Sequence, residues 1–289
     1  MILDFRLRPP TKTFLNLNIF PKPEEERTKS FGWHSPLPPS VRQRSMDHFI
    51  SEMKEAGINN GVLWGRGVSH RPEESTTVAD VADTIAQYPD IFCAGFAGVG
   101  VPEPGQIGHW LNIVDEALVD RKLAGITIDA QFSYPQVRSD DPRLYPIYQR
   151  CLELGGILAL TVSRGTEPYE NVSHANPEAV DTIAGHFPDL KIVVSHAFWP
   201  WVHEGLGVAF RRPNLYLCPD PYGMGMPGYL EWVQAANTFL EDRLIFASTY
   251  PRMGMQEAVN DYLKLPFKND LVCEKVMHKN AKVLLGIDG

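Results

Sequence analysis

Lys191–His196 (KIVVSH) is a short apolar run, rich in β-branched residues, that ends in the polar pair Ser195-His196. Runs of this length and composition are typical of strands buried in a parallel sheet. Similar runs recur along the whole chain, bounded by Gly, Pro or Asp: Ile2–Arg8, Gly61–Gly65, Ile91–Ala97, Gly125–Asp129, Ile157–Val162, Asn214–Cys218 and Arg243–Ser248. Together with the first run, they predict eight strands.

Segments with helical periodicity lie between these runs: Val41–Ala56, Thr77–Tyr88, Gln106–Lys122, Leu144–Leu154, Pro177–Phe187, Tyr229–Leu240 and Met255–Lys264. Strands that alternate with helices over fewer than 300 residues predict a closed (β/α)8 barrel, a TIM barrel of the α/β class, as a single domain over residues 1–289. A doubly wound open sheet is the alternative, but no glycine-rich dinucleotide fingerprint follows the first strand. The Pro-rich stretch 9–39 is expected to form one long loop.

The composition narrows the classes of function. A net charge of −8 and a pI near 5.6 argue against nucleic-acid binding, which relies on basic surface. No apolar stretch approaches the length of a membrane span, and no cationic segment leads into an apolar core at the N-terminus. The four cysteines show none of the paired spacings of zinc or redox motifs. We therefore expect a cytoplasmic protein with neither a nucleic acid nor a membrane as its partner.

The first predicted strand, Ile2–Arg8, carries its charges on alternate residues. Side chains alternate faces along a strand, so Asp4, Arg6 and Arg8 are expected on one side and the apolar residues on the other. Two arginines and a carboxylate cost too much free energy to bury without partners. This face is therefore either a solvated edge or the lining of a polar site where an anion binds.

Arginines gather where the predicted strands end, and in a barrel of this kind that end carries the chemistry. Guanidinium groups form planar, bidentate pairs with carboxylates and phosphates. Their number in an acidic protein predicts a site for a small carboxylate, bound by Arg6, Arg8, Arg66, Arg164 and Arg252. The alternative is that several of them form structural ion pairs with Asp4, Asp129, Asp140 or Asp220.

His196 is the strongest single candidate for a functional residue, because it ends a buried strand and is expected to project into the barrel mouth. Acid–base catalysis and metal ligation both suit that position, and a structural histidine is the alternative. Asp129, which ends the fourth strand, is the second catalytic candidate, and His174, Tyr222 and Thr249 are candidates for substrate contact. The sequence contains no His-x-His, no His-Glu-x-x-His, no Gly-x-Ser-x-Gly elbow and no phosphate-binding glycine loop.

Four stretches carry a family resemblance: Ser139–Pro146 (SDDPRLYP), Phe187–Ala197 (FPDLKIVVSHA), Asp242–Pro251 (DRLIFASTYP) and Lys279–Gly286 (KNAKVLLG). Together they resemble the amidohydrolase-related family of (β/α)8 proteins. The relevant branch includes aminocarboxymuconate-semialdehyde decarboxylase and pyrone-dicarboxylate lactonase. Each stretch is moderately specific by itself. Their order along the chain is that of the family, so the resemblance extends over almost the whole sequence.

The resemblance implies a metal site that this sequence does not reproduce. Arg6 and Arg8 replace the paired histidines usual on the first strand of the family. Thr161 replaces the histidine usual after the fifth strand, and Thr249 replaces the aspartate usual after the eighth. Only the histidine of the sixth strand remains, as His196. Arginine is permanently cationic and repels a divalent ion, so we expect no cofactor; His196 is a weak candidate for holding an ion such as zinc.

These features lead to three hypotheses. The first is a metal-independent hydrolase of a small carboxylated ester or lactone, in which the arginines hold carboxylates and His196 or Asp129 activates water. The second is a decarboxylase (carboxy-lyase) of a small unsaturated acid. The third is a non-catalytic barrel that binds an anionic metabolite. The family further suggests a homodimer or a higher homo-oligomer.

Overall fold

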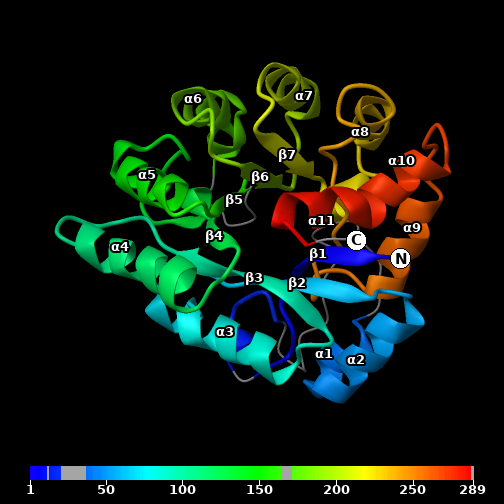
Figure 1. Ribbon diagram of the computed structural model, residues 1–289, viewed down its shortest axis with the longest axis horizontal. Coiled ribbons are helices and arrows are strands. Elements are labelled where there is room, and N and C mark those ends of the chain that lie inside the picture. Colours follow the sequence, from blue (N-terminus) through cyan, green and yellow to red (C-terminus); the bar gives the residue numbers. More distant parts are fainter. Residues whose placement is uncertain (12, 21–36, 164–170, 288–289) are drawn as a thin grey trace.

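The computed structural model describes residues 1–11, 13–20, 37–163 and 171–287, which form a barrel of parallel strands surrounded by helices (Figure 1). One sheet holds seven strands in sequence order, each paired with the next. Their bounds are β1 Leu3–Leu7, β2 Asn60–Trp64, β3 Phe92–Val99, β4 Gly125–Ile128, β5 Ile157–Thr161, β6 Ile192–Ser195 and β7 Leu215–Cys218. The fold is the predicted TIM barrel, although one of the predicted strands is missing.

The eighth predicted strand, Arg243–Ser248, closes the barrel without forming a strand of its own. It runs between β7 and β1: a single bridge joins Leu244 to Leu217, Ile245 N donates to Leu217 O at 2.9 Å, and Phe5 N donates to Phe246 O at 3.2 Å. The backbone amide of Ser248 donates instead to a carboxylate of β1, at 3.1 Å. The chain then turns at Thr249, whose φ is 62°. Because the backbone N–H of Ser248 is bonded to a side chain, it cannot donate to a neighbouring strand. The ladder of backbone hydrogen bonds therefore ends here.

Helices surround the sheet, with the bounds α1 Pro39–Gln43, α2 Met46–Glu55, α3 Val78–Gln87, α4 Ile107–Asp115, α5 Tyr145–Glu153, α6 Glu178–His186, α7 Val202–Arg211, α8 Tyr229–Ala236, α9 Met255–Leu263, α10 Asp270–Glu274 and α11 Asn280–Leu285. The sequence did not predict α7, because Gly205 and Gly207 lower its helix propensity. Gly205 is needed there, since a Cβ would lie 2.4 Å from the ring of Phe198. None of the described helices is long and apolar enough to cross a membrane.

The predicted helix Val41–Ala56 is in fact two helices, α1 and α2. Arg44 ends α1 in the left-handed conformation, with φ 50°. Ser45 then caps α2, because its hydroxyl accepts a hydrogen bond from His48 N at 3.3 Å. The break therefore comes from local capping, which competes with the continuous apolar face.

Strand β1 departs from the strict alternation expected for it. Leu3 and Phe5 pack inside the barrel with Trp64, whereas Leu7 belongs to the apolar layer between the barrel and the helices. The pairing register of β1 with β2 shifts within the strand, and irregularities of this kind re-aim side chains. Asp4 and Arg6 of the strand, and Arg8 directly after it, are all buried, with Arg6 only 4% exposed. The strand therefore lines a polar site and is not a solvated edge.

The two ends of the barrel differ. At the end where the strands begin, Ala281 and Leu284 of α11 join the apolar cluster that fills the barrel. At the end where the strands stop, polar residues gather. Part of the predicted loop 9–39 lies outside the described residues, namely 12 and 21–36; in its described part, Asn18 accepts a hydrogen bond from Arg66.

Candidate functional site

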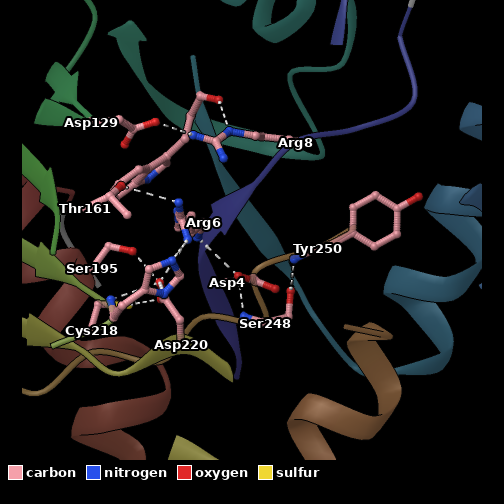
Figure 2. A network of polar contacts seen from close by, with 12 residues as sticks. Asp4, Arg6, Arg8, Asp129, Thr161, Ser195, Cys218, Asp220, Ser248 and Tyr250 are labelled. Atoms are coloured by element: carbon pink, nitrogen blue, oxygen red, sulfur yellow. Dashed lines mark hydrogen bonds and ion pairs between the residues drawn. The ribbon is translucent and has the colours of Figure 1, made fainter. Parts of the chain in front are cut away.

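The guanidinium of Arg6 lies at the centre of the polar residues in the barrel mouth (Figure 2). Its Nη1 donates to Asp220 Oδ2 at 3.1 Å and to His196 Nε2 at 3.2 Å. Its Nη2 donates to Thr161 Oγ1 at 3.4 Å. The guanidinium carbon also lies 5.2 Å from the centroid of the Trp64 ring, within range of a cation–π interaction. One side chain of β1 thus joins the ends of β5, β6 and β7.

His196 is neutral, and its contacts define its tautomer. Arginine only donates hydrogen bonds, so Nε2 accepts from Arg6 and the ring proton resides on Nδ1. Nδ1 lies 3.1 Å from Asp220 Oδ2, close enough for an electrostatic contact but out of line for a hydrogen bond. Burial, and then the charge of Arg6, lower the pKa of His196 to about 4. Its basic lone pair is already engaged, so His196 is a poor general base at neutral pH.

The ring of His196 is positioned by an unusual turn after β6. Three consecutive residues, His196, Ala197 and Phe198, have left-handed φ values of 66°, 41° and 70°. Non-glycine residues rarely adopt this conformation, and such residues cluster at functional sites. Phe198 N donates to Val162 O at 3.2 Å, which ties the turn to the end of β5.

Asp220 is the main acceptor of the site, although the sequence indicated it only as a structural partner for an arginine. Besides Arg6, its carboxylate accepts hydrogen bonds from Ser195 Oγ, from His196 N at 3.3 Å and from Cys218 Sγ at 2.7 Å. Burial favours its neutral form, but His196, Arg6 and Cys218 outweigh burial and hold the pKa of Asp220 below its usual value. No motif marks this residue; its only signal in the sequence is its place directly after a strand.

Arg8 and Arg66 share a second carboxylate, that of Asp129. Nη2 of Arg8 lies 3.9 Å and Nε of Arg66 lies 3.7 Å from Asp129 Oδ2. Burial opposes ionisation, but Arg8, Arg66 and Arg6 outweigh it and lower the pKa of Asp129. Among the described residues, Nε of Arg66 and Oδ1 of Asp129 have no hydrogen-bond partner. Buried polar atoms are normally paired, so these two atoms remain able to bond to a ligand or a water molecule.

Positive charge exceeds negative charge in the mouth. Burial and the charges of Arg6, Arg66 and Arg252 lower the pKa of Arg8, and Asp129 opposes them only in part. Because arginine stays protonated in proteins, this shift reflects burial of the charged group first and the crowding of cations second. Three buried guanidinium groups face the two ionised carboxylates described above, and a small anion would neutralise the excess.

Asp4 lies beside this cluster and is the group that titrates closest to neutral pH within it. Its Oδ1 accepts hydrogen bonds from Arg6 N at 3.2 Å and Ser248 N at 3.1 Å, whereas its buried Oδ2 has no partner among the described residues. Burial raises the pKa of Asp4 to about 7, against the opposing effect of the hydrogen bonds from Ser248 and Arg6. Figure 2 shows Asp4 between Arg6 and Ser248.

Three more of the predicted substrate contacts lie near the cluster. The ring of Tyr222 meets that of His196 edge to face, with centroids 5.1 Å apart, and stacks on Trp199 at 4.6 Å. Thr249 is buried, and its Oγ1 has no hydrogen-bond partner in the described part of the chain. Arg252 is near enough to Arg8 to affect its pKa.

Two predicted substrate contacts remain, Arg164 and His174. Arg164 lies outside the described residues. His174 lies in a short 3-10 turn, Val172–Ala175, and within the described residues its buried Nδ1 has no hydrogen-bond partner. Asp140, predicted as a structural partner of a mouth arginine, instead pairs with Arg138 at 2.9 Å.

The fold and the site define a TIM barrel whose mouth is lined by arginines, the class that the resemblance implied. The sequence profile of the amidohydrolase family matches residues 9–287, so the chain belongs to this family. An uncharacterised TIM-barrel protein from Bordetella bronchiseptica is 35% identical, with 99% of this chain and 98% of that protein covered and a TM-score of 0.90. No curated protein sequence is significantly similar to the chain.

Two more distant structures share the fold. Dihydroxybenzoic acid decarboxylase from Polaromonas, with bound manganese and 2-nitroresorcinol, is 15% identical, with 99% of this chain and 97% of that protein covered and a TM-score of 0.67. A probable 2-pyrone-4,6-dicarboxylic acid hydrolase from Acinetobacter baumannii, with citric acid bound, is 16% identical, with 99% of both chains covered and a TM-score of 0.61.

The residues of this mouth do not fit a divalent metal. In the described part of the chain, no three His, Cys, Asp or Glu side chains converge on one point. His196 and Asp220, the nearest groups of the ligating type, both contact the guanidinium of Arg6. A divalent ion about 4 Å from that guanidinium would be repelled by roughly 8 kcal/mol at an effective dielectric constant of about 20. Asp129, the other ionised carboxylate of the mouth, faces Arg8 and Arg66, whose charges also oppose a divalent ion.

Proposed function

We propose that the protein is a decarboxylase that acts on a small unsaturated or aromatic acid, whose carboxylate binds at Arg8 and Arg66. The excess of buried guanidinium groups around Asp129 is the observation that carries this proposal. Hydrogen bonds from a guanidinium to a carboxylate are about twice as strong as neutral ones, and Nε of Arg66 is free to donate one. The mouth would then hold the substrate without a metal ion.

The chemistry of the neighbouring groups suits decarboxylation better than hydrolysis. Hydrolysis needs a base that can activate water near neutral pH. The pKa of His196 is about 4 and its lone pair accepts from Arg6, while the pKa of Asp129 is held low by three guanidinium groups. Decarboxylation needs no activated water. The bond between carbon and the carboxylate breaks, CO2 leaves, the electron pair stays on the substrate near Arg6, and a proton from solvent replaces CO2.

The structures of similar fold support the same choice. Most of those that carry the name of an activity are decarboxylases of aromatic acids, namely of 2,6-dihydroxybenzoate, 5-carboxyvanillate and dihydroxybenzoic acid. One of these structures holds 2,6-dihydroxybenzoate. These proteins favour one reaction class, the decarboxylation of an aromatic acid.

Hydrolysis of a carboxylated lactone is the second candidate, and a specific atom favours it. Oδ1 of Asp129 is ionised, buried and without a hydrogen-bond partner among the described residues, so it can hold an attacking water. The similar structure named as a dicarboxylic acid hydrolase supports this reading. The low pKa of Asp129 makes it a weak base, which is why we rank this reaction second.

Incubation with 2,6-dihydroxybenzoate, 5-carboxyvanillate and 2-pyrone-4,6-dicarboxylic acid tests the proposal. We expect CO2 to be released in a one-to-one ratio with consumption of an aromatic acid, by protein treated with a chelator. The variant Arg66→Ala should lose this activity, and Arg211→Ala, which removes an exposed arginine at the end of α7, should keep it. Ring opening without CO2 would support the lactonase, and binding without turnover would support the non-catalytic barrel. Absence of both binding and turnover would contradict the proposal.

A further inference from the structure

We propose that the guanidinium of Arg6 is the resident cation of this site: it occupies the place among Asp220, His196 and Thr161 that a divalent ion would need, and it fixes His196 as the Nδ1–H tautomer. This role of Arg6 concerns the cation of the site and not the reaction. It can be wrong while the proposed decarboxylation is right, and it can be right while the proposed decarboxylation is wrong.

Three hydrogen bonds converge on the guanidinium of Arg6. Nη1 spends both of its hydrogens, one on Asp220 Oδ2 at 3.1 Å and one on His196 Nε2 at 3.2 Å, while Nη2 reaches Thr161 Oγ1 at 3.4 Å. A carboxylate oxygen, an imidazole nitrogen and a hydroxyl are acceptors that a divalent cation would also use. All three already face a cation, and that cation is part of the chain.

The surroundings of Arg6 also favour a cation at this position. Asp220 is fully buried, and Oδ2, the oxygen that faces Arg6, also accepts hydrogen bonds from Ser195 Oγ and His196 N. These donors favour its ionised form, and a buried carboxylate is stable only beside a positive charge. The face of Trp64 adds a cation–π contact to the guanidinium. Nε of Arg6 is buried and has no partner among the described residues, so it remains able to donate to a ligand.

Arg6 and Asp220 act together on the tautomer of His196. Asp220 Oδ2 lies 3.1 Å from Nδ1, and a carboxylate favours a proton on the imidazole nitrogen that faces it. The Arg6 contact acts in the same sense from the other side of the ring, since an arginine cannot accept a hydrogen bond and Nε2 must therefore be unprotonated. Arg6 is in this sense a positioning residue for His196.

Removal of Arg6 should therefore create a metal site where the wild-type protein has none. Titration with Mn²⁺, followed by the loss of the free-ion signal in electron paramagnetic resonance, tests this directly. We expect Arg6→Ala to bind one Mn²⁺ at least about tenfold more tightly than the wild-type protein, because the repulsion is gone. The double variant Arg6→Ala with His196→Gln should lose this gain. The control Arg66→Ala removes a mouth guanidinium that does not touch His196, and it should not gain Mn²⁺ affinity.

A measurement on the wild-type protein keeps the inference falsifiable even if Arg6→Ala does not fold. Nitrogen-15 NMR of the imidazole, assigned with His196→Gln, should show a protonated Nδ1 and an unprotonated Nε2 at neutral pH. An Nε2–H tautomer, or stoichiometric binding of Mn²⁺ to the wild-type protein that His196→Gln abolishes, would overturn the inference. If either occurs while CO2 release persists, the proposed function survives and only the role of Arg6 is wrong.

Discussion

The substitution Asp4→Asn should change the pH dependence of stability by a predictable amount. The folded protein holds the pKa of Asp4 at about 7, against an ordinary value of 3.8, mainly because the carboxyl is buried. Between these two pH values the folded state keeps a proton that the unfolded state has lost, so the stability that Asp4 contributes below pH 4 is lost as the pH rises to 7. Three pKa units correspond to about 4 kcal/mol. Asparagine has no proton to lose, and the variant should escape this loss.

Urea unfolding, followed by tryptophan fluorescence at several pH values, measures the effect. The free energy of unfolding of Asp4→Asn minus that of the wild-type protein should rise by about 4 kcal/mol from pH 4 to pH 7 and then level off. Asp90→Asn, which changes an exposed aspartate before β3, should give a difference that does not vary over this range. A level difference for Asp4→Asn as well would refute the burial of a carboxyl group at this position.

The remaining predictions concern the same mouth and one helix. His196→Gln should act in the opposite sense to Asp4→Asn. Because the pKa of His196 is lowered from 6.5 to about 4, its contribution to stability is lost as the pH falls through this range. In urea unfolding, the variant should therefore gain about 3 kcal/mol of stability relative to the wild-type protein by pH 4. A level difference would contradict this. In calorimetry, Arg66→Ala should weaken the binding of 2,6-dihydroxybenzoate by about 1.5–3 kcal/mol, and Arg211→Ala should not; equal losses would contradict a specific role. Gly205→Ala should destabilise the protein by about 1–3 kcal/mol, because its Cβ would lie 2.4 Å from an aromatic ring. Gly207→Ala, with nothing within 4 Å, should stabilise it by about 0.5–1 kcal/mol, and urea unfolding distinguishes the two.

The barrel could be predicted because its signals are local. Each strand is a short apolar run, and the order of strands and helices along the chain leaves few topologies. The closure of the barrel was less predictable, since it depends on a hydrogen bond from Ser248 to Asp4 across most of the chain. The register shift in β1, which places Leu7 apart from Phe5, likewise depends on pairing with a neighbouring strand.

The sequence indicated which residues gather in the barrel mouth better than it indicated which of them pair with one another. The rule that chemistry lies at strand ends selected Arg6, Arg8 and Asp129, since barrel topology brings those ends together. It could not show which carboxylate faces which arginine, because that depends on side-chain directions over a few ångströms. The central role of Asp220 and the blocked lone pair of His196 therefore emerged only from the structure.

The central claim is that the mouth binds a small carboxylate through its own arginines and needs no metal ion there. A crystal structure of the protein grown with 2,6-dihydroxybenzoate and Mn²⁺ tests both parts at once. We predict the carboxylate oxygens within about 2.7–2.9 Å of Arg8 and Arg66, no anomalous peak beside His196, and Arg6 still in contact with Asp220. A manganese ion between His196 and Asp220, with Arg6 displaced, would contradict the account.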